Sequence, residues 1–363
     1  MSPDEENEYF SDGITEEIIH ALSRIKGLHV TARTSSFTFK HQNLDVREIG
    51  RKLNVALLLE GSIRKSDTII RITAQLTETV NGFHVWSDTW DRELKNIFTV
   101  QDEIAALIAE KLDQDIQNKV NSPAQVIENT EALDWYLKGN YLLNQWDFNE
   151  RNHIIAYFEK AIELDPRLIQ AYIGLANTYT WLGSTGHVKP EDAYGKVEYC
   201  IKKVLSIDKN IPDVYIIIAG KNFWIEWDFP AALRNINKAL EIQASNSDAL
   251  KYKGLILASM GRIEEALDNF FQADRLDPYS EHIKAGIGMI YNYTNDNEKA
   301  LEYIERNIEI CPYWYAQYLD QTEALCKLKR YDEARDIIQM LEHDPHSPLS
   351  IALMKNFYLA NYG

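Results

Sequence analysis

The chain has 363 residues, of which 45% are hydrophobic, so it is long enough for more than one structural unit and apolar enough to bury real cores. Its 38 Lys and Arg stand against 55 Asp and Glu, giving a formal net charge of -17. Such a surface would repel a phosphate backbone, which argues against nucleic-acid binding. The three cysteines, Cys200, Cys311 and Cys326, show no Cys-x-x-Cys spacing and indicate neither a disulfide framework nor a zinc site.

The sequence contains no run of about 18 apolar residues of the kind that spans a membrane. Its start, Met1-Ser-Pro-Asp-Glu-Glu-Asn, is acidic where a signal peptide would be basic and then apolar. We therefore expect no direct membrane insertion and a cytoplasmic location. A membrane segment encoded upstream of Met1 would instead place the chain in the periplasm.

The first 115 residues predict a mixture of helices and strands. The pair Ser11-Asp12 is a good N-cap for an amphipathic helix that ends near Lys26. A short strand is expected over residues 28–34, and Asp45 caps a second helix. Residues 55–65 are β-rich. In the next strand, apolar residues alternate with polar ones. The apolar residues, which are expected to face inward, are Ile70, Ile72, Ala74 and Leu76.

The turn signal Asn81-Gly82 leads into a third strand over residues 83–89, so three consecutive strands are expected to pair antiparallel. Thr99 and Asp102 then resemble a capping box for one more helix. The apolar face of this last helix carries Ile104, Leu107, Ile108 and Leu112. Residues 1–115 thus predict an α+β domain with a mixed or antiparallel sheet covered by helices.

Five segments in order resemble the TolB N-terminal-like domain: Glu8-Tyr-Phe-Ser-Asp-Gly, Ala32-Arg-Thr-Ser-Ser-Phe, Asp45-Val-Arg-Glu-Ile-Gly, Leu59-Glu-Gly-Ser-Ile-Arg and Gln101-Asp-Glu-Ile-Ala. The resemblance covers residues 8–110. It implies a place in bacterial signalling proteins, often downstream of a class III nucleotide cyclase or a winged-helix regulator. Members of that family usually begin with an apolar strand that is absent after Met1. An open sheet edge would follow, which predicts a less stable domain or a homodimer formed through that edge.

A repeat organises the remainder of the chain. Residues 254–278 predict a helical hairpin, with Gly261 ending its first helix and Pro278 its second. Ala273 lies 34 residues after Ala239 (273 − 239), and Pro312 lies 34 after Pro278 (312 − 278). This period and these residue types resemble the tetratricopeptide repeat, which implies a solenoid of stacked helix pairs.

Following a polar linker at residues 116–130, residues 131–363 predict an all-α tetratricopeptide solenoid of about six helix pairs. A late second helix in the second pair predicts an inserted loop at residues 184–192. Residues 349–359 predict a capping helix that covers the last exposed face.

The resemblance implies that the first helix of each pair lines a concave groove for a protein or peptide ligand. Asn offers a donor and an acceptor to a peptide backbone, Lys pairs with a carboxylate, and aromatic side chains give rigid apolar area. The competing interpretation is that the tryptophans are buried between helices and the lysines are ordinary solvated charges. The residues expected in the groove are Asn140, Asn144, Asn177, Trp181, Lys221, Trp224, Lys251, Met289, Asn292 and Tyr293.

Common hydrolase, nucleotide-binding and metallopeptidase motifs do not occur, so we predict no enzymatic activity, no cofactor and no metal. Asp12, Glu16 and Glu17 form an acidic cluster that is expected to complement a helix start. The predicted function is a scaffold or interaction module of a bacterial signalling protein. Two alternatives stay open: the regulatory part of a class III adenylate or guanylate cyclase, and the effector part of a winged-helix transcriptional regulator, each with its active domain upstream of Met1.

Overall fold

The structure is a computed structural model, and it describes residues 8–25, 27–66, 69–93, 103–108, 129–145 and 148–343. The chain divides into two compact units, residues 1–249 and residues 250–363. Each unit is described by itself below. Helices α5 to α16 are arranged like those of tetratricopeptide solenoids, and a small antiparallel sheet lies near the N-terminus, as the sequence predicts.

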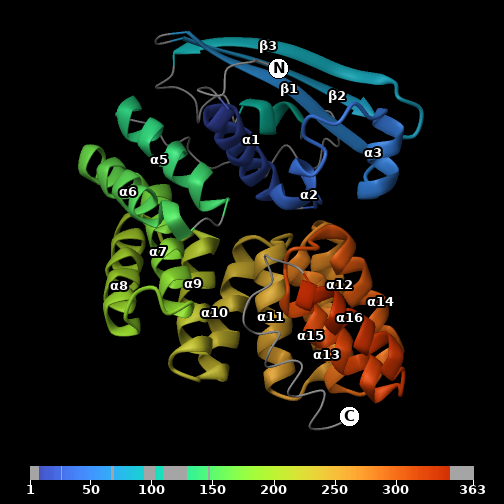
Figure 1. Ribbon diagram of the computed structural model, residues 1–363. Helices are drawn as coiled ribbons and strands as arrows, with labels where there is room; N and C mark the ends of the chain where they lie inside the picture. Colours follow the sequence, from blue (N-terminus) through green and yellow to red (C-terminus); the bar gives the residue numbers. More distant parts are fainter. Residues whose placement is uncertain are drawn as a thin grey trace. The chain divides into compact units, whose positions relative to one another are not determined.

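The first unit opens with three helices, α1 (Glu8–Ser23), α2 (Arg33–Phe37) and α3 (Val46–Leu53). Three strands follow, β1 (Leu57–Ser66), β2 (Ile69–Glu78) and β3 (His84–Glu93), paired antiparallel in the order β1-β2-β3. Figure 1 shows the three helices on one face of the sheet. Residues 103–108 are also helical and bury Ile104 and Ile108.

The central strand β2 carries the apolar side of the sheet. Its inward side chains are buried, and the polar side chains between them are more exposed, because successive residues of a strand point to opposite faces. Ile72 lies opposite Ile63 of β1 and Trp90 of β3, which places three apolar side chains in one cross-strand row. The predicted alternation is confirmed.

Two local predictions about the N-terminal region are wrong. Helix α1 begins at Glu8, so Ser11 and Asp12 lie inside it, and the Asp12 carboxylate binds Lys40 instead of capping a helix. The strand expected over residues 28–34 does not form, because Ala32 is already the N-cap of α2 and no described strand pairs with this segment. By contrast, Asp45 caps α3 as predicted, accepting from the backbone N–H of Arg47.

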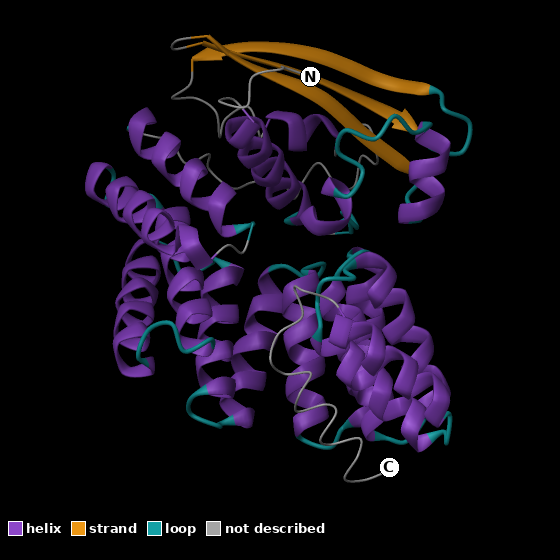
Figure 2. Ribbon diagram, in the orientation of Figure 1, coloured by secondary structure: helices purple, strands orange, loops and turns teal. Residues whose placement is uncertain are grey.

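Among the described residues, helices α5 to α16 form six consecutive pairs. Figure 2 shows these helices in purple. The first unit holds three of the pairs: α5 (Thr130–Leu143) with α6 (Arg151–Leu164), α7 (Ile169–Ser184) with α8 (Pro190–Ile207), and α9 (Pro212–Trp224) with α10 (Phe229–Ile242). A short 3-10 turn, η4 (Phe148–Glu150), precedes α6. The loop between α7 and α8 lies within the predicted insertion, but spans only residues 185–189, because Pro190 starts α8 early.

The second unit continues the pattern with α11 (Ser247–Ser259) and α12 (Ile263–Leu276), α13 (Glu281–Tyr293) and α14 (Asn297–Ile310), and α15 (Ala316–Lys327) and α16 (Tyr331–His343). The first residues of α11 belong to the first unit. The predicted capping helix at residues 349–359 and most of the predicted linker lie outside the described residues.

In each unit, a phenylalanine side chain of a second helix packs between two glycines of neighbouring first helices. The ring of Phe158 on α6 lies against Gly139 and Gly174, where an added Cβ would come within 3.0 Å and 2.4 Å of it. In the second unit, the ring of Phe270 on α12 lies against Gly254 and Gly286, with corresponding distances of 2.5 Å and 2.4 Å. Only a residue without a side chain lets the first helices approach so closely, which explains the glycines that mark the repeat in the sequence.

Candidate interaction faces

The first solenoid helix, α5, is in contact with the chain's own N-terminal helix α1. Gly13 lies so close to Leu137 that an added Cβ would come within 2.4 Å of the leucine Cδ2 atom. The Tyr136 hydroxyl donates to Glu17 at 2.8 Å, and the Tyr9 hydroxyl donates to Asp134 at 2.6 Å. The two helices therefore interlock through both apolar packing and polar contacts.

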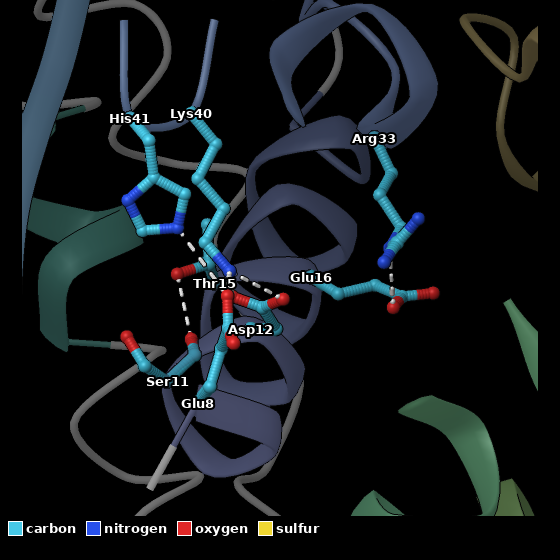
Figure 3. A network of polar contacts seen from close by, with 8 residues as sticks. All are labelled: Glu8, Ser11, Asp12, Thr15, Glu16, Arg33, Lys40 and His41. Carbon is cyan, nitrogen blue, oxygen red and sulfur yellow. Dashed lines mark hydrogen bonds and ion pairs between the residues drawn. The ribbon is translucent and has the colours of Figure 1, made fainter. Parts of the chain in front are cut away.

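Glu16 is the polar centre of this contact. Its Oε2 atom accepts from the side-chain amides of Asn140 at 2.9 Å and Asn144 at 3.2 Å, and it lies 3.0 Å from the Arg33 Nε atom. Figure 3 shows Arg33 reaching back from α2 toward Glu16. Two of the residues predicted to line a peptide groove thus bind a carboxylate of the same chain.

A second polar cluster holds the segment after α2 against α1. Figure 3 shows Lys40 and His41 pointing toward the N-terminal turns of α1. The Lys40 ammonium contacts Glu8 at 2.5 Å and Asp12 at 2.6 Å. Burial favours the neutral amine, but hydrogen bonds to Asp12 and Glu8 outweigh it and raise the pKa of Lys40. The same lysine lowers the pKa of Glu8.

The acidic cluster on α1 therefore has a different role from the predicted one. Asp12, Glu16 and Glu17 lie in the body of the helix, where a carboxylate has little interaction with the dipole of the helix start. Glu17 is buried, and this burial raises its pKa. Burial, followed by the charges of Glu17 and Glu16, raises the pKa of Tyr136 well above its ordinary value. Glu16 and Glu17 position α1 on α5, whereas Asp12 binds Lys40.

Helix α7 presents the next two predicted groove residues. Asn177 is exposed, and Trp181 is half-buried. The backbone carbonyl of Trp181 accepts from the hydroxyl groups of Ser184 and Thr185, so the end of α7 is held by side-chain hydrogen bonds. Asn177 is accordingly the more available of the two for a ligand.

On α9, Lys221 and Trp224 lie one turn apart. The Lys221 ammonium is 2.9 Å from the Glu226 carboxylate, and this contact, with a hydrogen bond from Asn222, lowers the pKa of Glu226. Trp224 is 54% exposed and packs edge-on against Phe223 at 4.6 Å between ring centroids. Of the two predicted tryptophans, Trp224 is thus the one that projects into solvent.

Helix α13 of the second unit exposes Met289 and Tyr293, which lie one turn apart and are 47% and 78% exposed. Asn292, the third groove residue predicted on α13, is not exposed with them. It is 5% exposed because its amide donates to the Asp320 carbonyl at 3.3 Å and its own carbonyl accepts from Lys327 at 2.9 Å.

Lys251 on α11 is half-buried, and its ammonium lies 5.7 Å from the centroid of the Tyr252 ring. On α15, Leu319 is partly exposed beside Asp320, a residue that the sequence reasoning missed. Burial and the neighbouring Glu323 raise the pKa of Asp320 to about 6. No sequence motif marks this carboxylate, because its burial depends on the packing around α15.

Chemical sites of other kinds do not emerge from the described ranges. They contain no group of three or more His, Cys, Asp or Glu side chains placed to hold a metal ion. Among these same residues, none of the helices is long and apolar enough to cross a membrane. Cys200 is buried, which raises its pKa to about 12 and keeps it in the thiol form at neutral pH.

A family model described as tetratricopeptide repeat matches residues 282–313, which span most of α13 and all of α14. The chain is also similar to two curated bacterial proteins. Putative adenylate cyclase 3 of Rhizobium meliloti (strain 1021) is 36% identical over 180 residues, which are 48% of this chain and 30% of that protein. Transcriptional regulator HilA of Salmonella typhimurium is 24% identical over 143 residues, 39% of this chain and 26% of that protein. The matched part is thus less than a third of either relative.

Two solved structures share the fold. The type IV pilus biogenesis factor PilW superposes with a TM-score of 0.51 at 13% identity, covering 62% of this chain and 99% of PilW. Human IFIT1, solved as a dimer with m7Gppp-AAAA, gives a TM-score of 0.58 at 14% identity and covers 100% of this chain and 79% of that one. The resemblance of residues 8–110 to the TolB N-terminal-like domain stays a prediction.

Proposed function

We propose that this chain is a non-enzymatic scaffold that binds an extended protein segment on the first helices of its helix pairs. The observation that carries the proposal is that each unit exposes large apolar side chains on a first helix that is otherwise largely buried: Trp224 in the first unit, and Met289 and Tyr293 in the second. Large apolar side chains on a soluble surface mark interaction sites when they gather on one face. Helical repeats arranged like those of tetratricopeptide proteins suit protein binding.

The polar residues of the first unit would fix the bound segment. Asn177 is exposed and can both donate to and accept from a peptide backbone. Lys221 already pairs with Glu226, so a carboxylate of the ligand would have to compete with that pair. Pairing of Lys221 with a C-terminal carboxylate of the ligand is therefore the less favoured form of the proposal.

Helix α1 limits the surface that a ligand can reach in the first unit. Asn140 and Asn144 hold Glu16, so a segment that used them would first have to displace α1. We therefore place the binding surface of the first unit on α7 and α9. The N-terminal region would serve as the part that fixes the start of the solenoid.

A role in bacterial signalling is the wider form of the proposal. Residues resembling the TolB N-terminal-like domain support it, as does the relative named putative adenylate cyclase 3. That relative favours a second candidate function, in which the chain is the regulatory part of a nucleotide cyclase. An effector role in a winged-helix regulator is the remaining alternative, supported by the weaker similarity to HilA. Nucleotide-cyclase and promoter-binding assays on the complete gene product would separate these roles.

The homodimer through an open sheet edge also stays a proposal. In the described sheet, β1 and β3 each pair with β2 alone, so each presents one outer edge. Sedimentation of the full chain over a range of concentrations tests it. A monomer at all concentrations would contradict the proposal.

Affinity capture from cell lysate tests the scaffold function. The full chain is compared with a Lys221→Ala/Trp224→Ala double variant and with Tyr199→Ala, a matched control because Tyr199 is 48% exposed on the second helix α8. We expect a partner that the native chain and the control retain and that the double variant loses, with unchanged helicity. Equal retention by all three proteins would contradict the proposed surface.

A further inference from the structure

The turns that join the two helices share one backbone feature in the last four of the six pairs. In pairs three to six, the residue at the turn has a positive φ, and these residues are Trp227 (55°), Gly261 (76°), Asn295 (61°) and Lys329 (61°). They follow one another at intervals of 34 residues. The repeat therefore demands a left-handed conformation at this position, which glycine and asparagine adopt most readily.

Tryptophan is a poor choice for such a position. Its Cβ atom crowds the backbone in the left-handed conformation, whereas Gly261 meets the same demand without that crowding. Trp227 is also 73% exposed, so its ring gains little from burial in this chain. Neither the backbone nor the core of the third pair explains why a tryptophan stands there.

Trp227 is connected to Trp224 through a series of aromatic contacts, because Phe229 lies against Phe223 at 5.5 Å between ring centroids and Phe223 lies against Trp224 at 4.6 Å. The Trp227 ring lies 6.3 Å from that of Phe229, and exposed Trp224 lies at the end of α9, three residues earlier. Two carboxylates flank Trp227 in sequence. Glu226 is bound by Lys221, and Asp228 caps α10 by accepting from the Ala231 N–H at 2.8 Å.

The charges of this turn decide what kind of side chain suits it. The ammonium group of Lys221 already neutralises the Glu226 carboxylate. The Asp228 carboxylate then gives the turn a net negative charge. Aromatic faces attract cations, and a guanidinium group stacks on an indole ring especially well. The formal net charge of -17 on the whole chain also draws basic partners.

We propose that Trp224 and Trp227 form the docking site for a protein segment that places an arginine side chain on the Trp227 ring beside Asp228. This inference rests on the proposed scaffold function, because it names the chemistry of the segment that the third helix pair binds. The exposed indole ring supplies the stacking surface, and the carboxylate supplies the opposite charge.

The test uses the full chain with 15N-labelled tryptophan and two capped peptides, one with arginines spaced by glycines and one with citrulline in place of each arginine. Citrulline keeps the shape of arginine and lacks its charge. We expect the arginine peptide to shift the Trp227 indole signal in a saturable way. We also expect it to bind about fivefold more tightly than the citrulline peptide.

Two glycine variants separate binding from backbone strain. Trp227→Gly and Lys329→Gly each relieve a left-handed non-glycine residue at equivalent turns, so each is expected to fold and to melt at a higher temperature than the native chain. Only Trp227→Gly is expected to weaken the binding of the arginine peptide, again by about fivefold. Equal binding of the two peptides, or unchanged affinity in Trp227→Gly, would overturn the inference.

The capture experiment distinguishes failure of this inference from failure of the scaffold function. A partner that is lost from the Lys221→Ala/Trp224→Ala variant and fully retained by Trp227→Gly would overturn the arginine site while supporting the scaffold.

Discussion

Replacing Glu16 with alanine should loosen the contact between α1 and α5. The substitution removes the acceptor of two amide hydrogen bonds, at 2.9 Å and 3.2 Å, and the partner of Arg33. The Glu16 side chain is only 13% exposed, so water replaces these contacts poorly. Hydrogen bonds to a charged acceptor contribute about 1.5–3 kcal/mol each, and partial rehydration of Asn140 and Asn144 recovers part of that. We expect a loss of about 2–3 kcal/mol in the free energy of unfolding.

Hydrogen exchange of α1 and α5, together with urea unfolding, measures this effect. Glu163→Ala is the matched control, because that glutamate is 70% exposed on α6 and pairs only with Lys160 among the described contacts. Exposed pairs of this kind contribute about 0–1 kcal/mol. Faster exchange in both helices of Glu16→Ala alone supports the reasoning. A change no larger than that of the control would refute it.

Three further predictions concern single contacts. Burial raises the pKa of Glu17, so the stability that this side chain contributes is complete below the unfolded-state pKa and is lost as the pH rises through the raised value. Glu17→Gln removes this dependence. Melting curves should therefore show that the variant is more stable relative to the native chain at pH 8 than at pH 5. Gly286→Ala places a Cβ 2.4 Å from the Phe270 ring and should lower the free energy of unfolding by about 1–3 kcal/mol. The loss should be smaller in a Phe270→Leu background, as measured by urea unfolding in a double-mutant cycle. Lys327→Met removes the bonds to the backbone carbonyl and to the side-chain carbonyl of Asn292 and should cost about 1–2 kcal/mol by the same assay, and an unchanged free energy of unfolding would contradict the contact.

The helix pairs could be predicted from the sequence because their determinants recur at short range. Gly254, Phe270 and Ala273 fall within one pair, and the 34-residue period repeats their spacing. Alternation in β2 is equally local, since a strand exposes every second residue. These features needed no knowledge of distant parts of the chain.

The contact between α1 and α5 could not be predicted in the same way. Glu16 and Asn140 are 124 residues apart, and neither shows a pattern that points to the other. The sequence indicated only that Asn140 lies on the first-helix face. What covers that face depends on how the N-terminal region packs against α5.

The sequence also could not predict which side chains of a correctly predicted helix are exposed. Asn292 and Tyr293 are neighbours on α13, yet the first is buried against α15 and the second is open to solvent. Trp227 was overlooked because the sequence shows a tryptophan and does not show its positive φ. The comparison with Gly261 and Asn295 makes the anomaly visible only once the turns are known.

Photo-crosslinking in cells tests the scaffold account most directly. A benzoyl-phenylalanine is placed at Asn177 or Trp224 on the first helices α7 and α9 of the first unit, and at Glu163 on the second helix α6 as the control. The account predicts that both first-helix positions crosslink to one protein segment in the full chain and that the control position does not. Crosslinks from Glu163 alone, or no crosslink from either first-helix position, would contradict it.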